Sequence, residues 1–195
     1  MSQALFLGAH PDDVEVSAGG TVARLVDEDW DVVIAVLPQG FFDSGRNMEG
    51  QAAARILGAT YRMYAPQAVN HLISLIERDY PMPDLIVTPP PIDSHQDHRA
   101  VTKIGFALAR ENRTELWHMN FAIPGRISSP PLNHFVRFGL NAQERKELAL
   151  QAHTSQWLKY GGEVWAALIA NRDRYYGELL GASYAEGFER VYSFQ

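Results

Sequence analysis

Residues 4–37 read ALFLGAHPDDVEVSAGGTVARLVDEDWDVVIAVL, and this stretch decides the fold class. Its two ends, Ala4–Ala9 and Asp31–Leu37, are short apolar runs typical of strands that are buried on both faces. Between them, Gly20–Glu28 carries apolar side chains at helical spacing. Two buried strands joined by a helix form a parallel unit, and such crossovers are right-handed. The stretch therefore predicts the start of an α/β sheet.

The alternation of strand and helix continues along the chain. Further strands are predicted at Ala59–Tyr64, Asp84–Thr88, Glu115–Ala122 and, as a half-exposed edge, His134–Leu140. Further helices are predicted at Met48–Leu57, Val69–Arg78, Ala100–Arg110, Ala142–Gln151 after an Asn141 cap, and Val164–Leu180. We therefore expect a Rossmann-like α/β fold, a mostly parallel sheet with helices on both faces. Ligands of such sheets bind at the C-terminal ends of the strands.

Size and composition narrow the class of protein. The 195 residues are the length of one domain, so residues 1–195 are expected to fold as a single unit. A net charge of −6 argues against a nucleic-acid partner, and no apolar run reaches the roughly 20 residues of a membrane span. The absence of cysteine excludes disulfides and thiolate metal sites. The simplest expectation is a cytoplasmic protein with a small-molecule substrate, and a homo-oligomer is compatible with it.

Two polar tetrads carry the candidate chemistry. His10-Pro11-Asp12-Asp13 follows the first predicted strand, and His95-Gln96-Asp97-His98 follows the strand at residues 84–88. His10, Asp13 and His98 would supply the three protein ligands that a catalytic zinc site uses while a fourth position stays open for water. Asp12 and Asp13 are adjacent carboxylates, so one of them can bind the metal while the other accepts a proton from water. The spacing alone does not assign the two roles.

The second tetrad also offers groups for proton transfer. Once His98 binds the metal, His95 is a second imidazole that can donate to a developing oxyanion or to a leaving amine. Asp97 can orient one of these imidazoles, because a carboxylate on the far ring nitrogen fixes the tautomer. The two tetrads together therefore predict a metal-dependent hydrolase.

These residues match a known family. The chain resembles the PIG-L/LmbE-like family of metal-dependent N-acetylglucosamine deacetylases, whose first motif appears as AHPDDVE at residues 9–15 followed by AGGT at residues 18–21. The second motif appears as DSHQDHRA at residues 93–100. Weaker matches are Arg46-Asn47-Met48-Glu49 with the helix after it, and C-terminal elements within residues 146–156 and 185–188.

The resemblance implies a role for each candidate residue. It implies zinc ligands at His10, Asp13 and His98, a general base at Asp12, an acid or oxyanion stabiliser at His95 with Asp97 behind it, and substrate contacts at Arg46 and Asp93. Zn²⁺ is the expected cofactor, with another divalent transition metal as the alternative. The expected substrate is an amino sugar.

Two departures from the family pattern concern the loops. Gln96 stands where the family commonly has proline, and the loop Gln39–Arg46 lacks the usual Thr-x-Gly-Glu sequence. Because that loop would border the sugar, the departure bears on substrate identity more than on chemistry. His118 and Asn120, near the end of a predicted strand, are further candidates for lining the crevice.

The expected reaction is removal of the N-acetyl group from an N-acetylglucosamine-type sugar or sugar conjugate. A metal-dependent hydrolase of another amide or ester is the first alternative, because the loop Gln39–Arg46 differs from the family pattern. A non-catalytic nucleotide- or sugar-binding module is the second. The first strand-to-helix turn argues against that module, since it lacks the Gly-x-Gly-x-x-Gly phosphate cradle.

Overall fold

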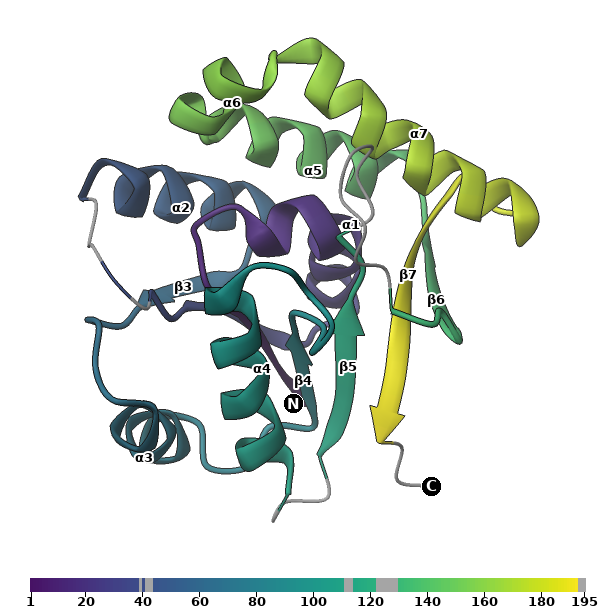
Figure 1. Cartoon of the computed structure of the whole chain (residues 1–195). Coiled ribbons are helices and arrows are strands. Elements are labelled where there is room, and N and C mark those ends of the chain that lie inside the picture. Colours follow the sequence, from purple (N-terminus) through teal and green to yellow (C-terminus); the bar gives the residue numbers. More distant parts are fainter. Residues whose placement is uncertain (39, 41–43, 111–113, 122–129, 193–195) are drawn as a thin grey trace.

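A seven-stranded, mostly parallel sheet forms the centre of the protein (Figure 1). The computed structural model describes residues 1–38, 40, 44–110, 114–121 and 130–192. The strands follow the order β3-β2-β1-β4-β5-β7-β6. They are β1 (Gln3–Gly8), β2 (Asp31–Val36), β3 (Thr60–Met63), β4 (Leu85–Thr88), β5 (Glu115–Met119), β6 (His134–Phe138) and β7 (Tyr184–Tyr192). The predicted fold class is confirmed, and β6 lies at the sheet edge as expected.

Helices cover both faces of this sheet (Figure 1). They are α1 (Asp13–Asp27), α2 (Ser44–Leu57), α3 (Val69–Asp79), α4 (Gln96–Ala109), α5 (Leu140–Ala152), α6 (Thr154–Tyr160) and α7 (Glu163–Leu179). Alternation along β1 explains the two layers, because successive side chains of a strand point to opposite faces. Phe6 packs into the core on the side of α1 and α2, whereas Leu5 and Leu7 pack on the side of α3 and α4.

Helices α5, α6 and α7 form an outer layer over α1 and α2 (Figure 1). A buried charge cluster ties this layer to the rest. Lys146 of α5 donates to Asp173 of α7 and, at 2.6 Å, to Glu186 of β7, and none of the three side chains is exposed. Glu186 also accepts hydrogen bonds from the backbone of Gly20 and Thr21 in α1, at 2.9 and 2.7 Å. The C-terminal third is thereby fixed to the helix that follows the first tetrad.

Four helix starts differ from the prediction by more than one residue. Helix α4 begins at Gln96 instead of Ala100, which places Asp97 and His98 in its first turn. Helix α1 begins at Asp13 instead of Gly20, so the first tetrad leads directly into it. Helix α2 begins at Ser44 instead of Met48, which places Arg46 in its first turn. The Asn141 cap is wrong: the backbone N–H of Gln143 bonds to the carbonyl of Gly139 at 3.2 Å, and α5 therefore starts at Leu140.

Two elements escaped the sequence analysis. Strand β7 inserts antiparallel between β5 and β6, although Glu186, Gly187 and Glu189 interrupt its apolar pattern. Glu186 is buried there because Lys146 neutralises it. Helix α6 is a seven-residue element in a stretch that gave no helical signal.

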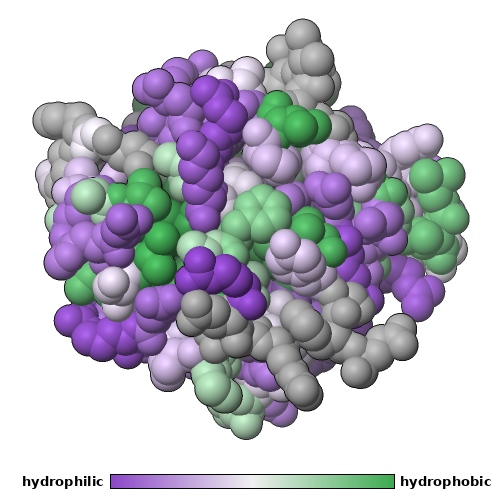
Figure 2. Space-filling model, turned by 60° about the horizontal axis from the view of Figure 1, so that its bottom comes forward, coloured by the Kyte–Doolittle hydropathy of each residue, from purple (hydrophilic) through white to green (hydrophobic). Residues whose placement is uncertain are grey.

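The outer surface is mainly hydrophilic on the face shown in Figure 2, where hydrophobic residues lie in separate groups. Among the described residues, no helix is long and apolar enough to span a membrane.

Candidate metal and catalytic site

Strand pairing brings the two tetrads together. Strands β1 and β4 are parallel neighbours, with Phe6 opposite Val87, and each tetrad lies beyond the C-terminal end of its strand. The ring centroids of His10 and His98 are consequently 5.4 Å apart, although 88 positions separate the residues in the sequence. The predicted convergence at this edge of the sheet is observed.

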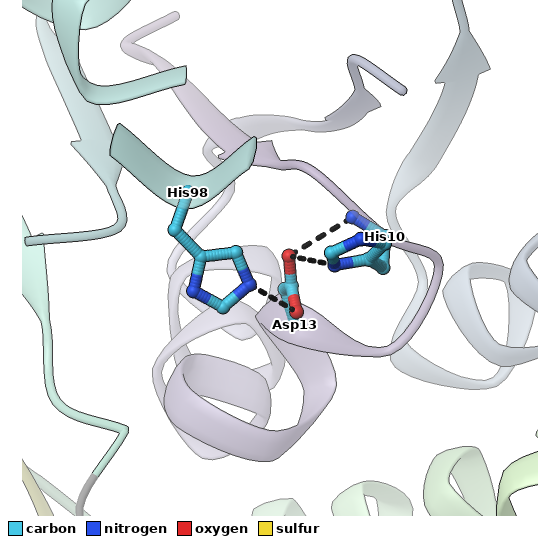
Figure 3. Close-up of side chains that lie close together, drawn as sticks. All are labelled: His10, Asp13 and His98. Carbon is cyan, nitrogen blue, oxygen red and sulfur yellow. Dashed lines mark hydrogen bonds and ion pairs between the residues drawn. The ribbon is translucent and has the colours of Figure 1, made fainter. Parts of the chain in front are cut away.

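Asp13 lies between the two imidazoles (Figure 3). Its Oδ1 is 3.3 Å from Nε2 of His98, and its Oδ2 is 3.5 Å from Nδ1 of His10. Each residue offers a ligand atom, and the three atoms lie within 4.8 Å of one another. Two imidazole nitrogens and one carboxylate oxygen are a donor set suited to a catalytic zinc ion. The residues present therefore fit such a metal.

The backbone holds the Asp13 carboxylate in this position. The N–H groups of Ala9 and His10 both donate to Oδ2 at 2.9 Å, because the His-Pro turn folds them toward the first turn of α1. Burial raises the pKa of Asp13, but the charge of His98 and hydrogen bonds from both histidines outweigh it and hold the pKa well below its usual range. Asp13 is accordingly anionic, the form in which a carboxylate binds a metal ion.

His98 is buried and supported from behind. Its Nδ1 lies 2.8 Å from Oδ2 of Asp93, which leaves Nε2 facing Asp13. Burial lowers the pKa of His98, whereas the carboxylates of Asp13 and Asp93 raise it, with a net value of about 10. A metal ion must therefore displace a proton from this imidazole at neutral pH.

Asp93 lies in a different place from the one predicted. We expected a substrate contact, but its side chain is buried and, in the described residues, is absent from the cavity wall. Besides His98, it accepts a hydrogen bond from the backbone N–H of His95 at 2.8 Å. Asp93 thus fixes both histidines of the second tetrad, a position from which a carboxylate orients a metal ligand.

Asp97 and His95 lie at the more open side of the site. Oδ2 of Asp97 is 3.4 Å from Nε2 of His10 and 3.9 Å from Nδ1 of His95. The same His95 nitrogen accepts from the backbone N–H of Asp97 at 3.3 Å. Burial, together with the neighbouring His10 and His98, lowers the pKa of His95. His95 is 43% exposed, which makes it accessible to a substrate.

Asp12 is held next to the donor set by Arg46. Its Oδ1 lies 2.6 Å from Nη2 of Arg46 in the first turn of α2. Burial and the adjacent Asp13 raise the pKa of Asp12 to about 6, although Arg46 and His153 act in the opposite direction. A carboxyl group with such a pKa suits a general base near neutral pH.

A cavity of about 260 Å³ opens over these residues. Among the described residues that line it, the sequence analysis identified six: His10, Asp12, Asp13, Arg46, His95 and His98. It missed six others, which are Val16, Phe121, Gln156, Lys159, Tyr160 and Trp165. Four of these six belong to α6 and α7. Their types carry no chemical signature, so only the tertiary structure reveals them.

The remaining candidates lie outside this wall as far as the described residues show. His118 pairs through Nδ1 with Glu189 at 2.8 Å, and Asn120 donates to the hydroxyl of Tyr176 at 3.0 Å. Of the loop Gln39–Arg46, residues 39 and 41–43 lie outside the described residues, and residues 44–46 begin α2.

Comparison with protein families identifies the chain. The model for GlcNAc-PI de-N-acetylase, PIG-L, matches residues 5–109, just over half of the sequence and both tetrads. The chain belongs to the PIG-L family. The predictions of the family and of an enzyme of deacetylase type are thereby confirmed.

Relatives of known function or structure extend the comparison over the full chain. Diacetylchitobiose deacetylase of Thermococcus kodakarensis is 28% identical over 228 residues, which cover 98% of this chain and 84% of that protein. The conserved protein TT1542 of Thermus thermophilus has 24% identity, 100% and 97% coverage and a TM-score of 0.79. GalB of Pseudomonas putida, a 4-carboxy-2-hydroxymuconate hydratase, has 18% identity, 100% and 98% coverage and a TM-score of 0.78. The fold therefore carries more than one chemistry, and the site must decide the reaction.

Proposed function

We propose that this member of the PIG-L family is a zinc-dependent hydrolase that removes the N-acetyl group from an N-acetylglucosamine-type sugar or sugar conjugate. One observation carries the proposal: a partly buried carboxyl group, Asp12, lies in the wall of the same cavity as the three donors His10, Asp13 and His98. A proton acceptor beside a metal-ligand set is the arrangement that metal-assisted hydrolysis requires.

The His and Asp residues of the two tetrads each have a role in this reaction. His10, Asp13 and His98 hold the Zn²⁺, which when bound polarises the amide carbonyl and lowers the pKa of water. Asp12 accepts the proton from the attacking water, and Arg46 keeps its carboxylate directed at the site.

His95, at the accessible side, donates a hydrogen bond to the oxyanion, and Asp12 returns the proton that it took from water to the departing nitrogen. Nδ1 of His95 accepts from the backbone of Asp97, so the neutral ring carries its proton on Nε2, the nitrogen available to donate. Asp97 supports His10 and His95 from the rim, and Asp93 supports His98 from the interior.

The cavity supports a small amino sugar as the substrate. Its volume of about 260 Å³ lies just below the range of roughly 300 to 1,000 Å³ that is typical of small-molecule sites. Phe121 and Trp165 give the cavity apolar surfaces, while Arg46, Gln156 and Lys159 supply polar ones. A single sugar ring has both kinds of surface, and the diacetylchitobiose deacetylase of Thermococcus kodakarensis is named for an acetylated amino sugar.

A side-by-side substrate panel tests the proposal. Zinc-loaded protein is assayed for acetate release from N-acetylglucosamine, diacetylchitobiose and other N-acetylglucosaminides, in parallel with simple amides, carboxylic esters and an unsaturated hydroxy acid as hydratase substrate. We expect turnover of an N-acetylated sugar that is lost after removal of the metal and in His98→Ala. Turnover confined to the esters, the simple amides or the hydratase substrate would replace the proposed reaction with one of the alternatives.

A further inference from the structure

Helix α6 forms one wall of the cavity and packs against the rest of the protein through few side chains, one of which is Trp157. Of its seven residues, all of them described, only Gln156 is buried, and Leu158 is 81% exposed. The helix nevertheless contributes Gln156, Lys159 and Tyr160 to the cavity. An isolated helix of this length is unstable in water, so interactions with the rest of the protein must hold it in place.

The N-terminus of α6 is capped from another helix. Its own N-cap residue, His153, makes no side-chain cap bond among the described residues. Glu49 of α2 supplies the acceptors instead. Its Oε1 accepts from Oγ1 of Thr154 at 2.9 Å and from the backbone N–H of Ser155 at 2.8 Å, and its Oε2 accepts from Oγ of Ser155 at 2.7 Å. Bonds to a carboxylate are stronger than neutral ones, and an anion is favourable at a helix N-terminus.

Glu49 lies one helical turn after Arg46. Residues three apart share a face of a helix, so the same face of α2 contacts the catalytic end of the cavity and the start of α6. Arg46 binds Asp12 at 2.6 Å, while Glu49 binds Thr154 and Ser155. The first turns of α2 thus connect the base with the opposite wall.

We propose that Glu49 is a positioning residue that anchors α6 and thereby sets how tightly the substrate binds. The substrate part of this inference rests on the proposed function, whereas the anchoring part concerns the fold alone. Glu49 touches neither the donor set nor Asp12 in the described contacts. Loss of the Glu49 carboxylate therefore weakens the attachment of α6 and leaves the proton-transfer groups in position.

Three variants separate this role from a general effect of mutation. Glu49→Ala removes all three bonds. Glu49→Gln keeps an amide oxygen that can accept from Ser155 N–H and Thr154, and its amide group can donate to the Ser155 hydroxyl. Glu77→Ala, which removes an exposed glutamate from α3, is the matched control.

Hydrogen exchange of the zinc-loaded variants tests the anchoring without any substrate. We expect the backbone amides of residues 154–160 to exchange about fivefold faster in Glu49→Ala, the effect of losing one helix cap of ordinary strength. The exchange rates of this segment in Glu49→Gln should remain close to those of the wild type, and the rates in Glu77→Ala should equal the wild-type rates. Equal exchange over this segment in Glu49→Ala and wild type overturns the inference.

Steady-state kinetics on the N-acetylated sugar that the wild type hydrolyses test the binding role. Because wall contacts are made in the ground state and the transition state alike, we expect KM to rise about fivefold in Glu49→Ala while kcat changes less than about twofold. Rescue of KM by Glu49→Gln supports the inference, and a fall in kcat at unchanged KM contradicts it. If the wild type hydrolyses no N-acetylated sugar, the proposed function fails, and the exchange data still decide whether Glu49 anchors α6.

Discussion

The two tetrads and the C-terminal third build opposite sides of one cavity by different means. His10 and Asp13 are three positions apart, and a single pair of neighbouring strands brings His98 to them. Gln156 and Trp165 reach the same cavity from an outer layer of helices that lies over α1 and α2. The proposed catalytic side is encoded in short motifs, whereas the proposed binding side depends on how distant elements pack.

The charged and titratable residues of the two regions also differ in their surroundings. The tetrads place titratable groups at the strand ends, several of them partly accessible, and in the proposed function these groups serve the reaction. The C-terminal third instead buries Lys146, Asp173 and Glu186 completely, where they serve the packing of α5, α7 and β7. Substitutions in the two regions should therefore have different effects, and the next four experiments are ordered from the largest expected effect to the smallest.

Lys146→Met should produce the largest loss of stability. The substitution leaves Asp173 and Glu186 buried without their shared cation, a change that typically costs about 3 to 5 kcal/mol. Urea denaturation measures the loss, and Lys103→Met, at an exposed position of α4, is the control. An unchanged free energy of unfolding would show that the cluster does not hold the outer layer.

Asp93→Asn should weaken metal binding by about 10- to 100-fold, the usual effect of removing a carboxylate behind a metal-bound histidine. The reason is the 2.8 Å contact between Oδ2 of Asp93 and Nδ1 of His98. Competition with a chromophoric chelator measures the zinc affinity. Asp97→Asn is the paired variant, and a larger effect there than at Asp93 would restore Asp97 as the main support of the ligand set.

Particular residues show what the sequence could reveal. The strand-end tetrads were recognisable because a local pattern of His and Asp has few other uses, and their convergence followed from the parallel order of β1 and β4. The burial of Asp93 could not be predicted, because the sequence does not tell which carboxylate turns inward. Strand β7 was missed because Glu186 becomes acceptable in a core only after Lys146 arrives from α5.

The predicted starts of the helices were wrong for a related reason. Gly45 and the polar residues around it look like a loop, yet α2 begins at Ser44, and Arg46 in its first turn is fixed by a contact with Asp12. Such a contact is made between segments more than 30 positions apart. Tyr160 and Lys159 were missed because their side chains are ordinary for an exposed helix.

Zinc binding to the metal-free protein should depend on pH. His98 has a pKa raised to about 10 by Asp13 and Asp93 against the effect of burial, so its proton competes with the metal at every pH below that value. Each displaced proton raises the apparent affinity about tenfold per pH unit. Calorimetry between pH 6 and 8, in two buffers of different ionisation enthalpy, measures the protons released. Binding without proton release would contradict the assignment of His98.

Tyr160→Leu should have the smallest effect, and it should fall on binding. The ring of Tyr160 lies 5.5 Å from that of Trp165 in the cavity wall, and the loss of such an aromatic pair corresponds to a rise in KM of about two- to tenfold. Tyr175→Leu, at an exposed position of α7, is the control. A fall in kcat alone would place Tyr160 on the catalytic side of the comparison.

In the proposed site, Asp12 moves protons while its neighbours hold the metal. The most direct measurement is acetate release by Asp12→Asn together with its zinc content, on the sugar that the wild type hydrolyses. We expect one zinc ion per chain, as in the wild type, and a rate lower by about 10²- to 10⁴-fold, the range for loss of a general base. Full turnover by Asp12→Asn, or loss of the zinc, would contradict the account.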